Sequence, residues 1–111
     1  MLNAAFVQIN LSLRCNLPAY AIFIRERTRD QAALDVYSPL AGASLAGHEA
    51  KVLAAYGPQT NLEGPESEGT VIVEFPTLEA AKAWYESPAY RAAREHRFRG
   101  ADYRALIVEG L

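Results

Sequence analysis

Alternating apolar and polar positions predict four strands in this chain, and wider apolar spacings predict helices between them. Residues 19–26 place one set of side chains on one side of the backbone (Tyr20, Ile22 and Ile24) and a second set on the other (Ala21, Phe23 and Arg25). A period of two is typical of a strand. Apolar stretches at residues 51–56, 71–75 and 103–109 predict the other three strands.

The first helix is predicted directly after the first strand. Asp30 can cap it through its carboxylate, and Leu34 and Tyr37 recur at helical spacing on its apolar side. Pro39 removes a hydrogen bond from any straight helix interior. We therefore expect Ser38 to act as a new N-cap and Pro39 to begin a second helical segment.

The second helix is predicted to follow the third strand and to have two parts. Thr77 can cap its start, and Trp84 falls on its apolar side. Ser87-Pro88 interrupts the pattern and restarts it as a cap and a first helical residue, and the helix then continues to about Arg97. The resulting order is strand, helix, strand, strand, helix, strand.

This order predicts an α+β domain of the ferredoxin-like, split-βαβ type, written βαββαβ. A weak internal repeat supports a division into two βαβ halves. Pro39 and Pro88 lie 49 positions apart, and each follows a serine. The same offset relates the first strand to the third.

The segment before residue 18 stands apart from this unit. Apolar residues alternate with polar ones from Ala5 to Leu13, and Asn16-Leu17-Pro18 ends the pattern. An extra strand at a sheet edge or across a dimer, or an unstructured leader, would fit. We divide the chain into an N-terminal extension, residues 1–17, and a ferredoxin-like domain, residues 18–111.

The apolar residues on both faces of the predicted sheet indicate self-association. Two helices cover only one face of a four-stranded sheet. We expect Ile22, Ile24, Val71 and Val73 to face the helices, which leaves Phe23 and Ile72 on the other side. Monomers rarely keep an exposed apolar face, so a homodimer with twofold symmetry is predicted, with the two sheets forming a dimeric α/β barrel.

Composition narrows the classes of partner and cofactor. The chain has 111 residues, a net charge of −2 and a pI of about 5.6, which argues against general nucleic-acid binding. No apolar run approaches the ~20 residues of a membrane span. A single cysteine, Cys15, and two histidines form no metal-ligand pattern. We predict a cytoplasmic protein with no metal and no cofactor.

Four short motifs in the second half of the chain resemble a known family. They are Glu74-Phe75-Pro76, Trp84-Tyr85, Ser87-Pro88-Ala89-Tyr90 and Val108-Glu109-Gly110. Residues 63–110 resemble the domain of unknown function 1330 family, and residues 18–57 do so more loosely. The stretch 52–56 departs from the family, which often has a glycine-rich segment with an arginine there.

The resemblance implies the dimeric α/β-barrel superfamily. That superfamily also holds cofactor-free monooxygenases, isomerases of small lactones and haem enzymes. Haem needs an axial ligand, and no histidine of this chain is clearly placed to supply one. The resemblance implies no particular activity.

Three residues are candidates for catalysis. His48 precedes the second strand, where a general base could reach a pocket between sheet and helix. The 49-residue offset matches Arg25 to Glu74, and we expect their strands to be parallel neighbours. An Arg25–Glu74 ion pair is therefore predicted, either to fix strand register and dimer specificity or to supply a carboxylate base. For His48 the alternative is a surface histidine.

Four residues are candidates for ligand binding. Tyr37, Trp84 and Tyr90 can wall an aromatic pocket for a small organic ligand, although aromatic residues at helical spacing are often plain core. Arg97 resembles the family's arginine before the last strand and belongs to a local basic region that could hold a carboxylate or phosphate. The alternative for that region is ion pairing on a wet surface.

Two classes of function stay open at this point. One is a cofactor-free enzyme of monooxygenase or isomerase type that acts on a small organic molecule. The other is a non-catalytic dimeric module that binds a ligand or has a structural role. An enzyme requires a polar group inside a closed apolar pocket, whereas a structural module would have a filled interior.

Overall fold

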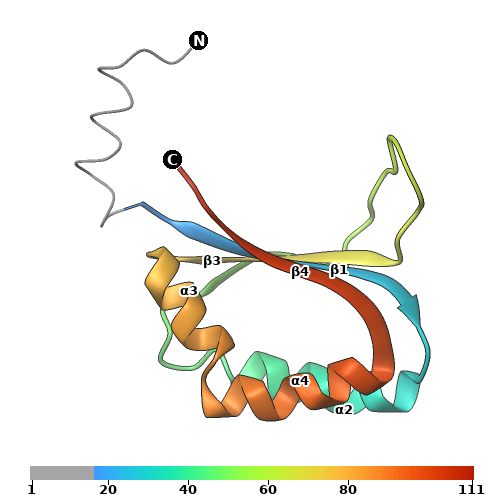
Figure 1. Ribbon diagram of the computed structural model, residues 1–111, viewed down its shortest axis with the longest axis horizontal. Coiled ribbons are helices and arrows are strands. Elements are labelled where there is room, and N and C mark those ends of the chain that lie inside the picture. The colour runs from blue at the N-terminus through green and yellow to red at the C-terminus, as the bar shows by residue number, and fades with distance from the viewer. Residues whose placement is uncertain (1–16) are drawn as a thin grey trace.

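The computed structural model describes residues 17–111, which form one four-stranded sheet with helices on one side (Figure 1). The elements are β1 (Ala19–Thr28), α2 (Gln31–Ala43), β2 (Lys51–Ala55), β3 (Gly69–Phe75), α3 (Leu78–Tyr85), α4 (Pro88–Gly100) and β4 (Ala101–Glu109). The strand order is β2-β3-β1-β4, and every neighbouring pair is antiparallel. The predicted ferredoxin-like α+β fold is confirmed.

Short polar signals start the helices where the sequence predicts them. The Asp30 carboxylate accepts the N–H groups of Ala32 and Ala33 at the start of α2. The Thr77 hydroxyl caps α3, and the Ser87 hydroxyl accepts the N–H of Tyr90 at the start of α4. These bonds satisfy N–H groups that have no partner inside the helix. The interruption at Ser87-Pro88 is therefore real.

The predicted break at Ser38 and Pro39 is wrong. Helix α2 runs through Pro39 without interruption. Tyr37 on the same helix is buried against the core, and this packing retains a helix that local preference alone would end.

The orientation predicted for the first strand is also wrong. Phe23 lies in the core with only 5% of its surface exposed, together with Ala19 and Ala21. Ile22 and Ile24 lie on the face without helices. The two faces of β1 are similarly apolar, so alternation alone could not decide between them. For β3 the prediction is confirmed, because Val73 is buried and Val71 packs against the core.

Antiparallel pairing of β1 with β3 overturns the predicted Arg25–Glu74 ion pair. Arg25 pairs with Gly69, and Glu74 pairs with Tyr20 at the other end of the ladder. Five positions of strand, at about 3.3 Å each, separate the two rungs. Strand β3 lies between β2 and β1 and runs antiparallel to both of them. An equal sequence offset therefore does not make the two residues neighbours.

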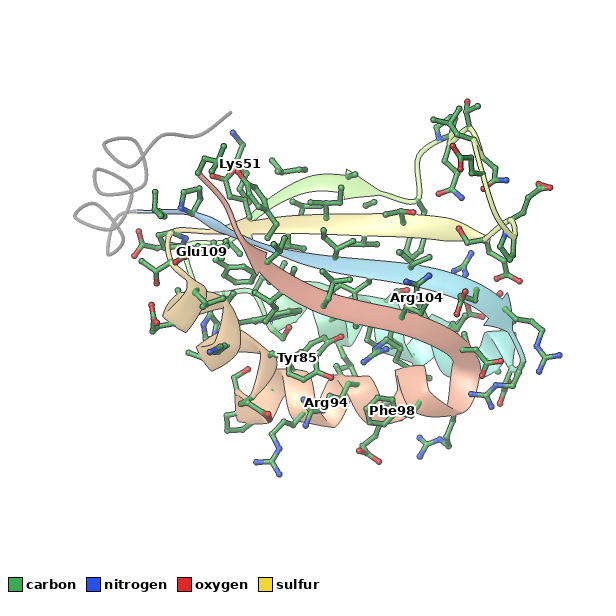
Figure 2. The ribbon with its side chains drawn as sticks, turned by 45° about the horizontal axis from the view of Figure 1, so that its top comes forward. Lys51, Tyr85, Arg94, Phe98, Arg104 and Glu109 are labelled. Atoms are coloured by element: carbon green, nitrogen blue, oxygen red, sulfur yellow. The ribbon has the colours of Figure 1, made fainter. Side chains whose placement is uncertain are left out.

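The face away from the helices keeps a continuous apolar row. Ile22, Ile72, Leu106 and Ala54 are register partners across all four strands. In the two neighbouring rows, Lys51 and Glu74 are register partners at the β2 side of one row, and Arg104 ends the other row on β4. Figure 2 shows Lys51 and Arg104 on the sheet, with Arg94 and Phe98 on helix α4. We call the surface of the sheet that faces away from the helices the open face.

The predicted strand over residues 5–13 lies outside the described residues. None of the helices in residues 17–111 is long and apolar enough to cross a membrane.

Ser44 provides a test of how the core is held. It is almost fully buried at the end of α2, and its hydroxyl accepts the Trp84 indole N–H at 2.9 Å. Ser44→Ala leaves that N–H without a partner in the core, which should lower the free energy of unfolding by about 1–3 kcal/mol. Urea denaturation measures this loss. The exposed Ser38→Ala is the control, and equal stability of the two variants would contradict this role for Ser44.

Candidate functional site

A cavity of about 280 Å³ lies between the sheet and helix α2. Its lining comes from three strands and from α2 and α3, and is mostly apolar or aromatic: Phe23, Tyr37, Ser38, Ala41, Gly42, Leu45, Val52, Ala55, Tyr56, Val71, Val73 and Trp84. A cavity of ~150 Å³ already accepts benzene. The cavity is open to solvent at its β2 side, where Val52 and Tyr56 are partly exposed. We call it the interior cavity, and it has room for a molecule of one or two rings.

Four tyrosine hydroxyls meet in two pairs beside the interior cavity. Tyr37 and Tyr90 hydroxyls lie 2.8 Å apart, and Tyr56 and Tyr103 hydroxyls lie 2.5 Å apart. Tyr37 and Tyr56 also line the cavity, so each pair reaches its wall. We call these four residues the tyrosine cluster.

Burial keeps three phenols of the tyrosine cluster, Tyr37, Tyr56 and Tyr90, in their neutral form. Removal from water raises the pKa of Tyr37, Tyr56 and Tyr90 above the ordinary value for a phenol. The nearby Arg97 charge acts in the opposite direction on Tyr37 and Tyr90, but burial outweighs it. At neutral pH these side chains are therefore phenols that can donate a hydrogen bond to an oxygen in the cavity.

Arg97 lies behind this phenol wall. It is in the last turn of α4, and only 4% of its surface is exposed. Its guanidinium carbon is 5.4 Å from the ring centre of Phe23, 5.0 Å from that of Phe98 and 5.1 Å from that of Tyr103. Its Nε is buried and has no hydrogen-bond partner among the described residues.

Trp84 belongs to the core and to the cavity wall at once. Its ring centre lies 4.2 Å from that of Tyr90 and 5.3 Å from that of Phe75. Its indole N–H is held by Ser44, which fixes the ring in place. Trp84 is therefore both a core residue and part of the pocket wall, the two alternatives that the sequence left open.

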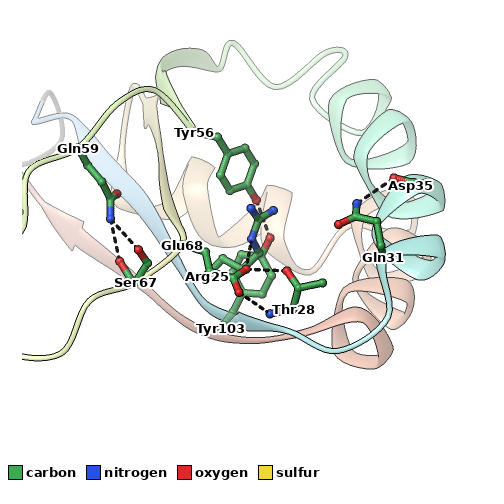
Figure 3. A network of polar contacts seen from close by, with 9 residues as sticks. All are labelled: Arg25, Thr28, Gln31, Asp35, Tyr56, Gln59, Ser67, Glu68 and Tyr103. Atoms are coloured by element: carbon green, nitrogen blue, oxygen red, sulfur yellow. Dashed lines mark hydrogen bonds and ion pairs between the residues drawn. The ribbon is translucent and has the colours of Figure 1, made fainter.

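Arg25 and Glu68 form a polar cluster next to Tyr56 (Figure 3). The Arg25 guanidinium carbon is 4.6 Å from the Tyr56 ring centre, and Arg25 Nε donates to the Glu68 carboxylate at 2.9 Å. Partial burial acts to lower the pKa of Arg25, but Tyr103, Tyr56 and Glu68 together raise it. Hydrogen bonds from Thr28, followed by Arg25, lower the pKa of Glu68.

Tyr56 has an unusual backbone that this cluster stabilises. Its φ of 60° is left-handed, which costs a residue other than glycine roughly 1–2 kcal/mol. The ring lies directly over Gly69, where a Cβ would come within 2.5 Å of Tyr56 Cδ1. Glycine at position 69 therefore makes room for the ring, and the contacts with Arg25 and Tyr103 hold it there.

The structure brings together the residues predicted to bind a ligand and separates those predicted to be catalytic. Tyr37, Tyr90 and Trp84 surround one region, with Arg97 next to it. Glu74 lies on the open face, and His48 lies in the turn after α2 and is not part of the cavity lining. The catalytic roles of Arg25, Glu74 and His48 stay predictions.

Sequence reasoning missed Tyr56 and Tyr103 as site residues. Tyr103 is the register partner of Arg25 across β1 and β4, so the correct pairing would have placed it next to the site. Tyr56 directly precedes Gly57-Pro58, which reads as the end of a strand and not as part of a pocket. Within residues 17–111 no three His, Cys, Asp or Glu side chains group to hold a metal ion.

Comparison with known proteins gives a family and a fold. Residues 18–111 match the family model described as "Domain of unknown function (DUF1330)". No curated protein matches the chain at a significant level.

Several solved structures share the fold at low sequence identity. A protein of unknown function from Rhodopseudomonas palustris is 20% identical with a TM-score of 0.68, over 100% of this chain and 95% of that one. A dimeric ferredoxin-like protein of unknown function from Thermobifida fusca is 16% identical with a TM-score of 0.63, over 86% and 92%. A putative antibiotic biosynthesis monooxygenase from Nitrosomonas europaea is 13% identical with a TM-score of 0.55, over 86% and 91%.

The Glu68 contacts predict a specific pH dependence of stability. Because the folded-state pKa of Glu68 is lowered, its stabilising contribution is present above the ordinary value of 4.5 and is lost as the pH falls through the folded-state value. Glu68→Gln should therefore be less stable than wild type at neutral pH, and the two should converge in acid. Urea denaturation across this range measures the effect. Glu63→Gln, in the same exposed loop, is the control, and parallel pH curves for wild type and Glu68→Gln would contradict the prediction.

Proposed function

The chain belongs to the domain of unknown function 1330 family, and on that premise we propose that it is a homodimer that binds a small, flat organic molecule in the interior cavity of each subunit. The observation that carries this proposal is an apolar cavity with two phenol hydroxyl groups in its wall. Ligand sites combine such apolar walls with a few convergent polar groups. A domain with a purely structural role would fill this space with side chains.

Binding is favoured over proton-transfer catalysis by the groups that line the cavity. General bases are usually His, Asp or Glu within hydrogen-bond reach of the substrate. None of the described lining residues is of these types. Glu68, the carboxylate next to Tyr56, already accepts hydrogen bonds from Arg25 and Thr28.

A cofactor-free enzyme is the second candidate, and one observation favours it. The phenols of the tyrosine cluster, with the Arg97 charge behind them, could stabilise negative charge on a substrate that ionises without help. A substrate of this kind would need no base from the protein. Oxygen consumption, or isomerisation of a bound lactone, distinguishes this candidate from binding alone.

The open face supports the dimeric part of the proposal. Its central row is apolar, and Lys51, Glu74 and Arg104 lie toward the ends, as in interfaces with an apolar centre and a polar rim. The loop of residues 56–68 projects beyond the sheet on this same side (Figure 1). Leu62 in this loop is 87% exposed, and a second copy packed on the open face would lie beside it. The similar Thermobifida fusca protein is described as dimeric.

Substitution of the open face tests the dimer. Light scattering of the wild type should give a mass twice that of the 12.2 kDa chain. Leu106→Asp places a charge in the proposed interface and should raise the dissociation constant at least ~100-fold, since burying an unpaired charge costs several kcal/mol. Val36→Asp is a matched control, because Val36 and Leu106 are both 45% exposed and Val36 lies on α2. A wild-type mass near that of one chain would rule out the homodimer.

Ligand binding can be followed through Trp84, the only tryptophan of the chain. A panel of phenols, lactones and fatty acids is titrated while its fluorescence and the oxygen concentration are recorded. At least one flat ring compound should change the fluorescence saturably without oxygen uptake. Tyr37→Phe should weaken its binding ~3–10-fold, the loss of about one hydrogen bond. Tyr85→Phe is the control, because Tyr85 is outside the lining of this cavity, and it should leave the affinity unchanged. If the two variants bind the compound with equal affinity, Tyr37 is not part of the site.

A further inference from the structure

Arg97 differs from the other described arginines because its charge is buried without a carboxylate partner, whereas Arg91, Arg99 and Arg104 are exposed to water. Arg25, Arg27, Arg29 and Arg94 each contact a carboxylate within 3.5 Å. Arg97 is more deeply buried than any of them, yet no carboxylate of residues 17–111 lies within ion-pair distance of it. Its buried Nε also has no hydrogen-bond partner in this part of the chain.

Aromatic rings and a hydrogen bond to the Tyr90 hydroxyl compensate only part of the cost of this charge. Burial of a charge without a counter-ion costs several kcal/mol, whereas a ring face contributes roughly 0.5–2 kcal/mol. Phe23, Phe98 and Tyr103 surround the guanidinium at distances that allow such contacts. The balance leaves a positive potential inside the domain that a bound anion would neutralise.

The tyrosine cluster connects this potential to the interior cavity. Tyr37 lines the cavity, and its hydroxyl contacts that of Tyr90. The Arg97 charge acts on both phenols, since it lowers their pKa against the effect of burial. An oxyanion in the cavity could therefore accept a hydrogen bond from the phenol wall while Arg97 stabilises its charge from behind.

We propose that the ligand of the interior cavity is a flat aromatic molecule of one or two rings that carries a single oxyanion, either a carboxylate or an acidic phenol. This inference rests on the proposed binding function and specifies its ligand. One charge is expected because one buried cation is uncompensated and the remaining lining is apolar. The aromatic body is expected because Phe23 and Trp84 form adjoining parts of the cavity wall.

Three probes of the same shape test the charge preference on the wild-type protein: 2-naphthoate, 2-naphthamide and 2-naphthylmethylamine. Dissociation constants are measured by calorimetry and by Trp84 fluorescence at neutral pH. The carboxylate should bind at least ~10-fold more tightly than the amide, and the amine should bind most weakly. For the phenolate arm, 4-nitrophenol should bind more tightly as the pH rises through its own pKa.

Two arginine variants on the same helix assign the preference to Arg97. Arg97→Met should reduce the carboxylate-to-amide preference to about one while leaving the amide affinity unchanged. Arg94→Met removes the same charge from an arginine that pairs with Glu86, and it should keep the preference. The melting temperature of Arg97→Met without ligand should not fall, because the variant loses an uncompensated buried charge.

The outcomes separate this inference from the proposed function. If the carboxylate and amide bind equally well, or the amine binds best, the anion inference is wrong and the binding function stands. If the wild type prefers the carboxylate and Arg94→Met loses that preference, Arg97 is not the recognising group. If no probe and no compound of the wider panel binds, both proposals fail. If Arg97→Met does not fold, the wild-type probe series still decides the charge preference.

Discussion

Antiparallel pairing of β1 with both β3 and β4 decides which side chains reach the interior of this domain. The register places Phe23 and Arg25 on the helix side, in line with Val71 and Gly69 of β3 and with Ala105 and Tyr103 of β4. Everything in the candidate site depends on that alignment. A shift of one residue would exchange these side chains for the isoleucines of the open face.

The interior is stabilised by aromatic packing and yet contains groups that packing alone does not satisfy. Trp84, Tyr90, Phe75 and Phe23 form a continuous set of ring contacts. Beside them lie a buried guanidinium without a counter-ion, a strained tyrosine backbone and a cavity. Each of these lowers stability, and proteins tend to concentrate such costs at sites that bind or react. Their occurrence in one region is the physical reason to assign function there.

The fold could be predicted because its signals are local. Asp30, Thr77 and Ser87 cap helices at the predicted positions. Pro39 shows the limit of local signals, since tertiary packing retained a helix that they would end. The faces of β1 could not be assigned, because Phe23 and Ile22 are both apolar, and side-chain size gives the only distinction between them. Tyr37, Tyr90, Trp84 and Arg97 were predicted individually, but the Arg25–Glu74 pair failed because sequence offset was taken as spatial register.

The central claim is that the interior cavity binds an aromatic oxyanion facing the tyrosine cluster and Arg97. A crystal structure of the protein with 6-bromo-2-naphthoate tests it directly, because anomalous scattering locates the bromine and the density orients the ring. We expect one molecule in each subunit, with the ring against Phe23 and Trp84 and the carboxylate within hydrogen-bond distance of the Tyr37 hydroxyl. Bromine found only on the open face or the outer helix surface, with the cavity empty of ligand, would contradict the account.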